Sequence, residues 1–432
     1  METQAKSFQK FILLWIGELV SAIGSGLTSF GLGVYIYEQT GKASAMALVT
    51  LLGFVPALIL SGLAGILADR YDRRLLMVLG DSLSVLGLVF ILLCMLKGEA
   101  QLWQICVGVT ISSIFTSLVD PAYKATVTDL LNKDQYTKAS GLVQIAGSSK
   151  FLISPALAGA LLLIADIKLL LLIDMATFFV TVLSTLAVRK GIEVKSSNKK
   201  LNLGQEFKEG WEAISKKRGV VVLVSVTSVL TFFMGFIQTL AMPMVLAFST
   251  STALGMLETI VASGMLVSGI IMGCLSIKGG YLKILSGSLF LSGIFMVLFG
   301  LRENMVLISI AGFLFFATLP FANASLDYLI RTNIDNKVQG RAWALIGMIS
   351  QLGYVGAYAL SGVLADYVFT PLLIEGGSLA DSVGRWIGVG IGRGTGFLIM
   401  IAGSLLAGMA IILYWIQPIR RLEEGGTACI SD

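Results

Sequence analysis

Two charged residues lie within long apolar stretches of the chain and could carry proton or ion chemistry. Glu18 is followed at helical spacing by Ser21, Ser25 and Thr28, which places four polar groups on one helix face. Lys150 lies near the middle of another apolar stretch, where a lysine costs about 2.5–3.5 kcal/mol on insertion scales. Each group needs an opposite charge, water or the loss of its own charge. We expect Glu18 and Lys150 to be functionally coupled; a purely structural role for each is the alternative.

Further acids lie in or near apolar stretches, with less specific surroundings. Asp174 and Glu258 each lie within about two helical turns of a segment end, so each has either a transport role or a contact with lipid headgroups. Asp327 is a candidate of the same kind, although Arg331 follows at i,i+4 and a local ion pair also explains it. Asp81 lies close to the arginines that precede it and is expected either to pair with them or to have a transport role.

Enzymatic chemistry and a bound metal are not expected. The chain has no histidine, which is the usual proton carrier near neutral pH, so any proton transfer falls to carboxylates or a lysine. The four cysteines form no C-x-x-C pair, which argues against disulfides and a metal site. The glycine-rich stretch 369–395 lacks the phosphate-loop pattern G-x-x-x-x-G-K-[ST] and is expected to be a surface loop. We expect no cofactor.

A dense charge cluster separates two of the apolar stretches. The cluster is part of Gly65-Ile66-Leu67-Ala68-Asp69-Arg70-Tyr71-Asp72-Arg73-Arg74. These charges cannot lie in hydrocarbon, so the stretch must be a short loop at a membrane face. Asp69 can also act on a nearby helix start, because a carboxylate there is favoured by about 0.3–1 kcal/mol. Orientation by positive charge alone accounts for the arginines but not for Asp69.

The elements that must position these residues are membrane-spanning helices. The chain has 56% hydrophobic and 13% charged residues, whereas soluble domains have roughly 45–50% and about 25%. The apolar residues form about twelve blocks, each near the ~20 residues that cross a bilayer as a helix. The predicted spans are 11–37, 45–68, 75–97, 102–119, 139–165, 168–188, 220–248, 254–277, 281–301, 305–330, 341–368 and 396–418. We expect an all-α membrane protein whose first span is not a cleaved signal peptide.

The distribution of positive charge predicts the orientation in the membrane. With the N-terminus inside, the inner loops and tails hold 24 of the 31 Lys and Arg residues, and the outer loops hold six. The bias persists when the long central loop is left out, so both termini are expected to be cytoplasmic. Orientation explains the basic excess, and nucleic-acid binding is not expected.

A polar stretch near the middle divides the chain into two halves. We expect an N-terminal six-helix bundle over 1–190, a cytoplasmic linker over 191–218, and a C-terminal six-helix bundle over 219–432 with an enlarged outer loop at 369–395. Within the linker, Phe207, Trp211 and Ile214 predict an amphipathic helix, lying either on the inner membrane surface or in the cytoplasm. An offset of 203 residues aligns Ala156-Leu157-Ala158-Gly159 with Ala359-Leu360-Ser361-Gly362, which indicates two parallel repeats.

The loop at 65–74 resembles the loop 2–3 signature of the major facilitator superfamily, G-x-x-x-D-R-x-G-R-R, with Asp72 in place of its second glycine. Asp120-Pro121-Ala122, Ala262-Ser263-Gly264-Met265-Leu266 and Gly340-Arg341 are similar to the bacterial macrolide-efflux branch. The resemblance implies twelve transmembrane helices in two six-helix bundles, with spans 1, 4, 7 and 10 around a central cavity. It implies that Asp69 braces the start of span 11 near Arg341, as a latch between conformers. The latch set is Gly65, Asp69, Arg70, Arg73, Arg74 and Arg341.

These observations predict a secondary active transporter in a bacterial cell membrane. It is expected to export hydrophobic or amphipathic small molecules by alternating access, with H+ as the coupling ion, and to act as a monomer in the lipid bilayer. One alternative is a transporter-like binding or sensor protein that does not transport. Another is an importer, or a lipid or siderophore permease, of the same superfamily.

Overall fold

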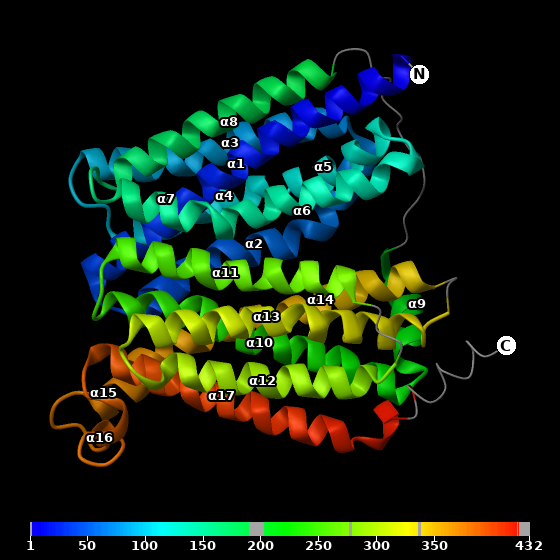
Figure 1. Ribbon diagram of the computed structural model, residues 1–432. Helices are drawn as coiled ribbons and strands as arrows, with labels where there is room; N and C mark the ends of the chain where they lie inside the picture. The colour runs from blue at the N-terminus through cyan, green and yellow to red at the C-terminus, as the bar shows by residue number, and fades with distance from the viewer. Residues whose placement is uncertain (1, 190–202, 276–278, 336–337, 421, 423–432) are drawn as a thin grey trace. The chain divides into compact units, whose positions relative to one another are not determined.

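The structure of the chain is a computed structural model that describes residues 2–189, 203–275, 279–335, 338–420 and 422. Every regular element within these ranges is helical, and no strand occurs in them. Long helices joined by short loops make up most of the chain (Figure 1).

The chain up to residue 189 folds into eight α-helices and one short 3-10 helix, η1. Their bounds are α1 Glu2–Thr40, α2 Ala43–Arg70, α3 Arg73–Leu96, α4 Leu102–Thr116, α5 Val119–Leu130, η1 Lys133–Gln135, α6 Tyr136–Leu152, α7 Ser154–Leu161 and α8 Ile167–Arg189.

The rest of the described chain folds into nine further α-helices and one π-helix, η2. Their bounds are α9 Leu203–Ser215, α10 Arg218–Leu246, α11 Ser251–Cys274, α12 Tyr281–Leu301, α13 Met305–Arg331, α14 Gln339–Leu364, η2 Ala365–Phe369, α15 Thr370–Leu373, α16 Gly384–Ile387 and α17 Ile391–Trp415.

Eleven helical stretches in the described residues are long and apolar enough to cross a membrane. They correspond to eleven of the predicted spans. Most ends are shifted by about five residues or fewer, but the stretch Leu102–Leu130 runs well past the predicted end at 119. The remaining predicted span, 139–165, is divided at Ile153 into α6 and α7. Pro155 lies in the first turn of α7, lacks a backbone N–H and disfavours helical geometry in the residue before it. Neither piece alone is long enough to count as a continuous span.

Large apolar side chains are exposed along the helices. On α8, Phe179, Leu183 and Leu186 are exposed on one face, whereas Phe178 and Thr181 are buried. A soluble monomer rarely exposes such continuous apolar surface. The exposed faces therefore suit contact with lipid.

The chain forms two compact units of packing. Unit 1 comprises Met1–Gly41, Leu48–Lys199 and Thr250–Thr259, and unit 2 comprises Lys42–Ala47, Lys200–Ser249 and Ile260–Asp432. The first residues of α2 thus pack in unit 2, although the helix continues in unit 1. The first turns of α11 pack in unit 1, although that helix continues in unit 2.

Unit 1 is built around α1, which packs against α8, α6 and α7, while α3 packs against α4 and α8. A buried apolar cluster joins these helices near the loop at 65–74. It contains Phe11, Leu14, Ala68, Leu76, Met77, Ala122, Tyr123, Leu130, Leu131, Ala139 and Val188.

Unit 2 is built around α12, which packs against α13 and α17, while α10 packs against α14 and α17. Arg393, at the start of α17, is only 1% exposed. Its Nη2 donates to the carbonyl oxygens of Gly300 and Leu301 at 2.9 Å each. These carbonyls end α12 and have no partner within that helix, so Arg393 caps it and fixes the preceding glycine-rich loop.

The predicted amphipathic helix is α9, which packs against α14 and α10. Ile214 is buried against the unit, whereas Phe207 and Trp211 are exposed. Glu212 pairs with Lys208 at 4.0 Å. The linker residues 191–202 lie outside the described residues.

Candidate functional site

A cluster of polar side chains lies between α1 and α8 in unit 1. The carboxylate of Asp174 is 2% exposed, and its Oδ1 accepts a hydrogen bond from Ser25 Oγ at 3.4 Å. The hydroxyl groups of Thr28 and Thr177 lie beside the same carboxylate. Of these hydroxyl groups Ser25 donates to the carboxylate, whereas Thr177 donates to the backbone carbonyl of Asp174 at 2.7 Å. An acid buried among apolar helices needs polar neighbours, because apolar surroundings disfavour its charge. Asp174 is thus surrounded by Ser25 and Thr28 from the polar stripe of α1 and by Thr177 of α8.

The half-buried Lys150, near the end of α6, lies within electrostatic range of Asp174. Among the described residues it makes no direct ion pair. The charged neighbour of Lys150 is therefore Asp174, and Glu18 is not among the groups that act on it. The structure brings together two of the predicted site residues, in a pairing that the sequence did not indicate.

Glu18 lies instead among acidic and phenolic groups. It is half-buried on α1 and interacts electrostatically with Asp81 of α3 and with Asp120 and Tyr123 of α5. Asp81 is 3% exposed, and neither its Oδ2 nor the Tyr123 hydroxyl has a hydrogen-bond partner in the described structure. Asp81 forms no ion pair with the arginines before it in the part of the chain described, so the expectation that it pairs with them is wrong.

The other two candidate acids have different surroundings. Glu258 lies half-buried on α11, in the turns that pack in unit 1, and makes no hydrogen bond or ion pair with another described residue. Asp327 pairs with Arg331 at 3.1 Å, and both side chains are about half exposed. Asp327 thus belongs to a local surface pair on α13, whereas Glu258 is half-buried without such a partner in the described chain.

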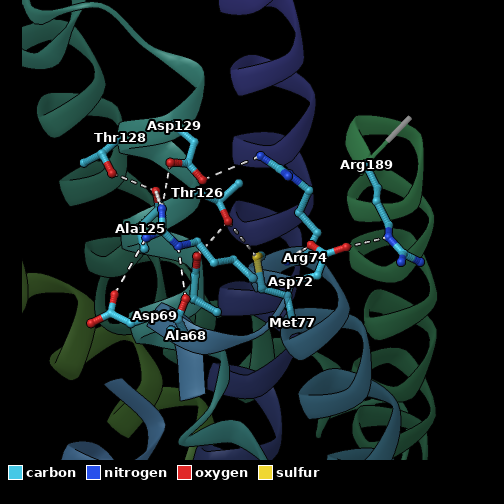
Figure 2. A network of polar contacts seen from close by, with 12 residues as sticks. Ala68, Asp69, Asp72, Arg74, Met77, Ala125, Thr126, Thr128, Asp129 and Arg189 are labelled. Atoms are coloured by element: carbon cyan, nitrogen blue, oxygen red, sulfur yellow. Dashed lines mark hydrogen bonds and ion pairs between the residues drawn. The ribbon is translucent and has the colours of Figure 1, made fainter. Parts of the chain in front are cut away.

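The loop at 65–74 is held by a network of ion pairs and hydrogen bonds (Figure 2). Arg73 contacts Asp69 at 3.7 Å and Asp129, on α5, at 2.7 Å. It also donates to the carbonyl oxygens of Ala68 and Ala125, at 3.1 and 3.2 Å. Arg74 is 3% exposed and lies 3.8 Å from Asp129. The network joins the end of α2 and the start of α3 to α5.

Asp72 has a position of its own in this network. Its Oδ1 accepts a hydrogen bond from the backbone N–H of Arg74 at 3.1 Å, which caps the start of α3, and its Oδ2 pairs with Arg189 at 2.8 Å. Figure 2 shows Asp72 between the start of α3 and Arg189, the last residue of α8. The departure from the family glycine at this position therefore adds a cap and a link to α8.

The remaining members of the predicted latch set lie in both units. Arg341, at the start of α14, pairs with Glu209 of α9 within unit 2. Asp69 is paired within unit 1, as described above. Gly65 has open space where a Cβ would lie, and Arg70 is exposed without an ion pair in the described residues.

Four functional candidates emerge that sequence reasoning missed or undervalued: Asp72, Asp81, Asp129 and Arg189. Asp72 stands directly before a helix, the usual place of an N-cap, so its role was readable from the sequence. Asp129 and Arg189 are distant in sequence from the arginine loop, and no local spacing marks them. The described residues contain no group of three or more acids, histidines or cysteines arranged to hold a metal ion.

Known proteins match this chain over most of its length. A family model described as Major Facilitator Superfamily matches residues 14–358. Macrolide efflux protein A of Streptococcus pyogenes is 25% identical over 430 residues, which cover 96% of this chain and 97% of that protein. The staphyloferrin A transporter of Staphylococcus aureus is 29% identical over 187 residues, or 41% of this chain and 43% of that protein.

Solved structures share the architecture. The crystal structure of the nucleoside transporter NupG superposes with a TM-score of 0.75 at 12% identity, covering 94% of this chain and 100% of that chain. Together with the eleven spanning stretches, this similarity confirms the predicted fold class. The family match covers most of the chain, and so the chain belongs to the Major Facilitator Superfamily.

Proposed function

We propose that the chain is a secondary active exporter of hydrophobic or amphipathic small molecules. It works by alternating access in a bacterial plasma membrane, with both termini cytoplasmic, as a monomer of two six-helix bundles. The relationship to macrolide efflux protein A over nearly the whole of both proteins supports the substrate class. The chain carries no phosphate-binding loop motif, which favours an ion gradient as the energy source.

Proton coupling is supported by the deep charged residues. Lys150 and Asp174 carry opposite charges in a region where each alone is costly. Glu18 and Asp81 carry like charges and repel each other when both are ionised, so a proton would relieve the cluster. One charge that crosses 100 mV supplies about 2.3 kcal/mol. The placement of Lys150 within electrostatic range of the buried Asp174 is the observation that carries this proposal.

The experiment uses a host strain that lacks its own efflux pumps. It compares cells that produce this protein with cells that do not. A panel of macrolides and unrelated amphipathic compounds is tested for growth inhibition and for accumulation in the cells. We expect lower accumulation of at least one class, abolished by a protonophore and by Asp174→Asn. Asp327→Asn, which alters a half-exposed pair, is the matched control and should retain export.

Unchanged accumulation of every compound would remove the efflux proposal. Import is the second candidate direction. The partial match to the staphyloferrin A transporter adds a second solute class to be tested, without indicating a direction. Vesicles of both orientations, loaded or bathed with the same compound, separate the two directions. A protein that binds the compounds in these vesicles but moves none of them would be the sensor alternative.

The latch on Asp69 is part of the proposed cycle. In this conformer Asp69 contacts Arg73 and Arg341 contacts Glu209, so each has a partner that a conformational change could replace. Asp69→Asn should slow transport in reconstituted vesicles with little change in the yield of folded protein. Wild-type turnover in that variant would show that the loop only orients the protein.

A further inference from the structure

The start of α2 is held by a carboxylate from the far end of the sequence. Oδ1 of Asp366 accepts a hydrogen bond from the backbone N–H of Ala43 at 3.1 Å, and Oδ2 accepts one from Ser44 at 2.7 Å. The first amide groups of a helix have no partner within it, and their positive end favours an anion. The first turn of α2 contains no acidic residue of its own, so Asp366 supplies the charge.

The end of α14 is shaped to bring Asp366 there. Asp366 lies in η2, a π-helical turn that directly continues α14, and such turns often occur at functional sites. One turn earlier, a Cβ on Gly362 would lie 2.5 Å from Ser44 Cα, so only glycine permits this approach. The ammonium group of Lys42 lies 5.9 Å from the centre of the Tyr367 ring. These contacts belong to unit 2, which includes residues Lys42–Ala47.

The repeat predicted from sequence has a matching contact in unit 1. Gly159 aligns with Gly362 and packs against the first turn of α11, where its Cβ would lie 2.9 Å from Ser251 O. Thr252 Oγ1 donates to Gly159 O at 2.9 Å. Gly159 and Gly362 therefore each pack against the first turn of a helix that continues in the other unit. The two contacts differ in charge, because the one in unit 1 uses a neutral hydroxyl and the one in unit 2 a carboxylate.

We propose that Asp366 is a positioning residue of the transport cycle, which holds the start of α2 in unit 2 and sets how often that start is released. The inference rests on the alternating-access cycle proposed above, since a helix that belongs to both units must lose one attachment when they move. Asp366 binds backbone N–H groups, and it therefore acts on α2 whatever side chains stand at positions 43 and 44.

The experiment measures the reactivity of a cysteine placed at Ser44 in a background from which the four native cysteines have been removed. Purified protein in lipid nanodiscs is treated with a water-soluble maleimide. Asp366→Ala should raise the labelling rate at least about fivefold, which corresponds to about 1 kcal/mol. Asp366→Asn keeps the shape and loses the charge, and it should give an intermediate rate.

Two controls separate release of α2 from general loosening. Asp381→Ala alters an exposed carboxylate of the neighbouring loop and should leave the Ser44→Cys rate unchanged. A cysteine at the exposed Lys97 should react equally with and without Asp366. Equal Ser44→Cys rates in the wild type and both Asp366 variants would overturn the proposal, even if transport is normal. A raised rate in a protein that transports no compound would uphold the attachment and refute the exporter instead.

Discussion

Lys150 and Asp174 are charged groups among apolar helices, and each is within electrostatic range of the other. Lys150→Met and Asp174→Asn should each abolish or strongly reduce transport, because each leaves one uncompensated charge. The double variant should be less impaired than the two losses combined, with a coupling energy above about 0.5 kcal/mol. The measurement is the transport rate of the wild type, the two single variants and the double variant in proteoliposomes with an imposed pH gradient.

The matched comparison is the cycle of Lys150→Met with Glu18→Gln. The sequence predicted coupling between Glu18 and Lys150. In the structure Glu18 interacts with Asp81, Asp120 and Tyr123, so we now expect its change to add to that of Lys150 with little coupling. A larger coupling with Glu18 than with Asp174 would show that the working partner of Lys150 changes in another conformer. If the effects of the single variants on transport add strictly in both cycles, Lys150 has a structural role only.

The presence of charged groups within apolar helices could be predicted from the sequence, but their partners could not. A charge within an apolar block marks Glu18 and Lys150 at once. Which acid approaches Lys150 depends on the rotation of α1, α6 and α8 about their axes. The contact of Ser25 with Asp174 reflects the rotation of α1 relative to α8, and it is known only from the structure. Asp81 shows the same limit, because proximity in sequence suggested an arginine partner and helix packing turned it toward Glu18.

At the scale of single helices, the start of α3 gives a direct test. Asp72→Ala removes the cap on Arg74 N and the pair with Arg189, and should lower the stability of the purified protein by about 1 kcal/mol. Asp72→Asn keeps a capping side chain and loses only the charge of a partly exposed pair, which is worth little. Thermal unfolding in the same detergent should therefore rank wild type, Asn and Ala in that order.

Asp327→Ala is the control for this series, since it removes an ion pair of similar length that caps no helix start. If it destabilises the protein as much as Asp72→Ala, the cap is not the cause. Equal stability of the Asn and Ala variants at position 72 would lead to the same conclusion.

Helix interiors were predictable, whereas interruptions within them were not. Long apolar blocks predicted α3, α8 and α12 to within a few residues at each end. Pro155 was visible within its block. Whether a proline bends or divides a helix depends on whether neighbouring groups donate hydrogen bonds to the carbonyl oxygens that it leaves free in the preceding turn. The π-helix at Ala365–Phe369 was not predicted, and it contains Asp366, whose contact with α2 joins residues far apart in the sequence.

At the scale of the whole molecule, the excess of positive charge predicts the orientation. Single cysteines at Ser215, the last residue of α9, and at Ser378, in the loop before α16, should lie on opposite sides of the membrane. An impermeant maleimide added to intact cells should label residue 378 at once and residue 215 only after permeabilisation. Labelling of both positions in intact cells would refute the proposed topology.

The division between α6 and α7 also bears on how the protein is made. The segment from Tyr136 to Leu161 combines a proline, Lys150 and several serines, and it is the one predicted span that falls outside the eleven apolar stretches of the described chain. A translocon that sorts segments by hydrophobicity would release it to the aqueous side as readily as to the bilayer. Its place in the membrane is secured by α1, emerging earlier, and by Asp174 on α8, emerging later. We therefore expect insertion of this segment to be completed only after α8 has left the ribosome.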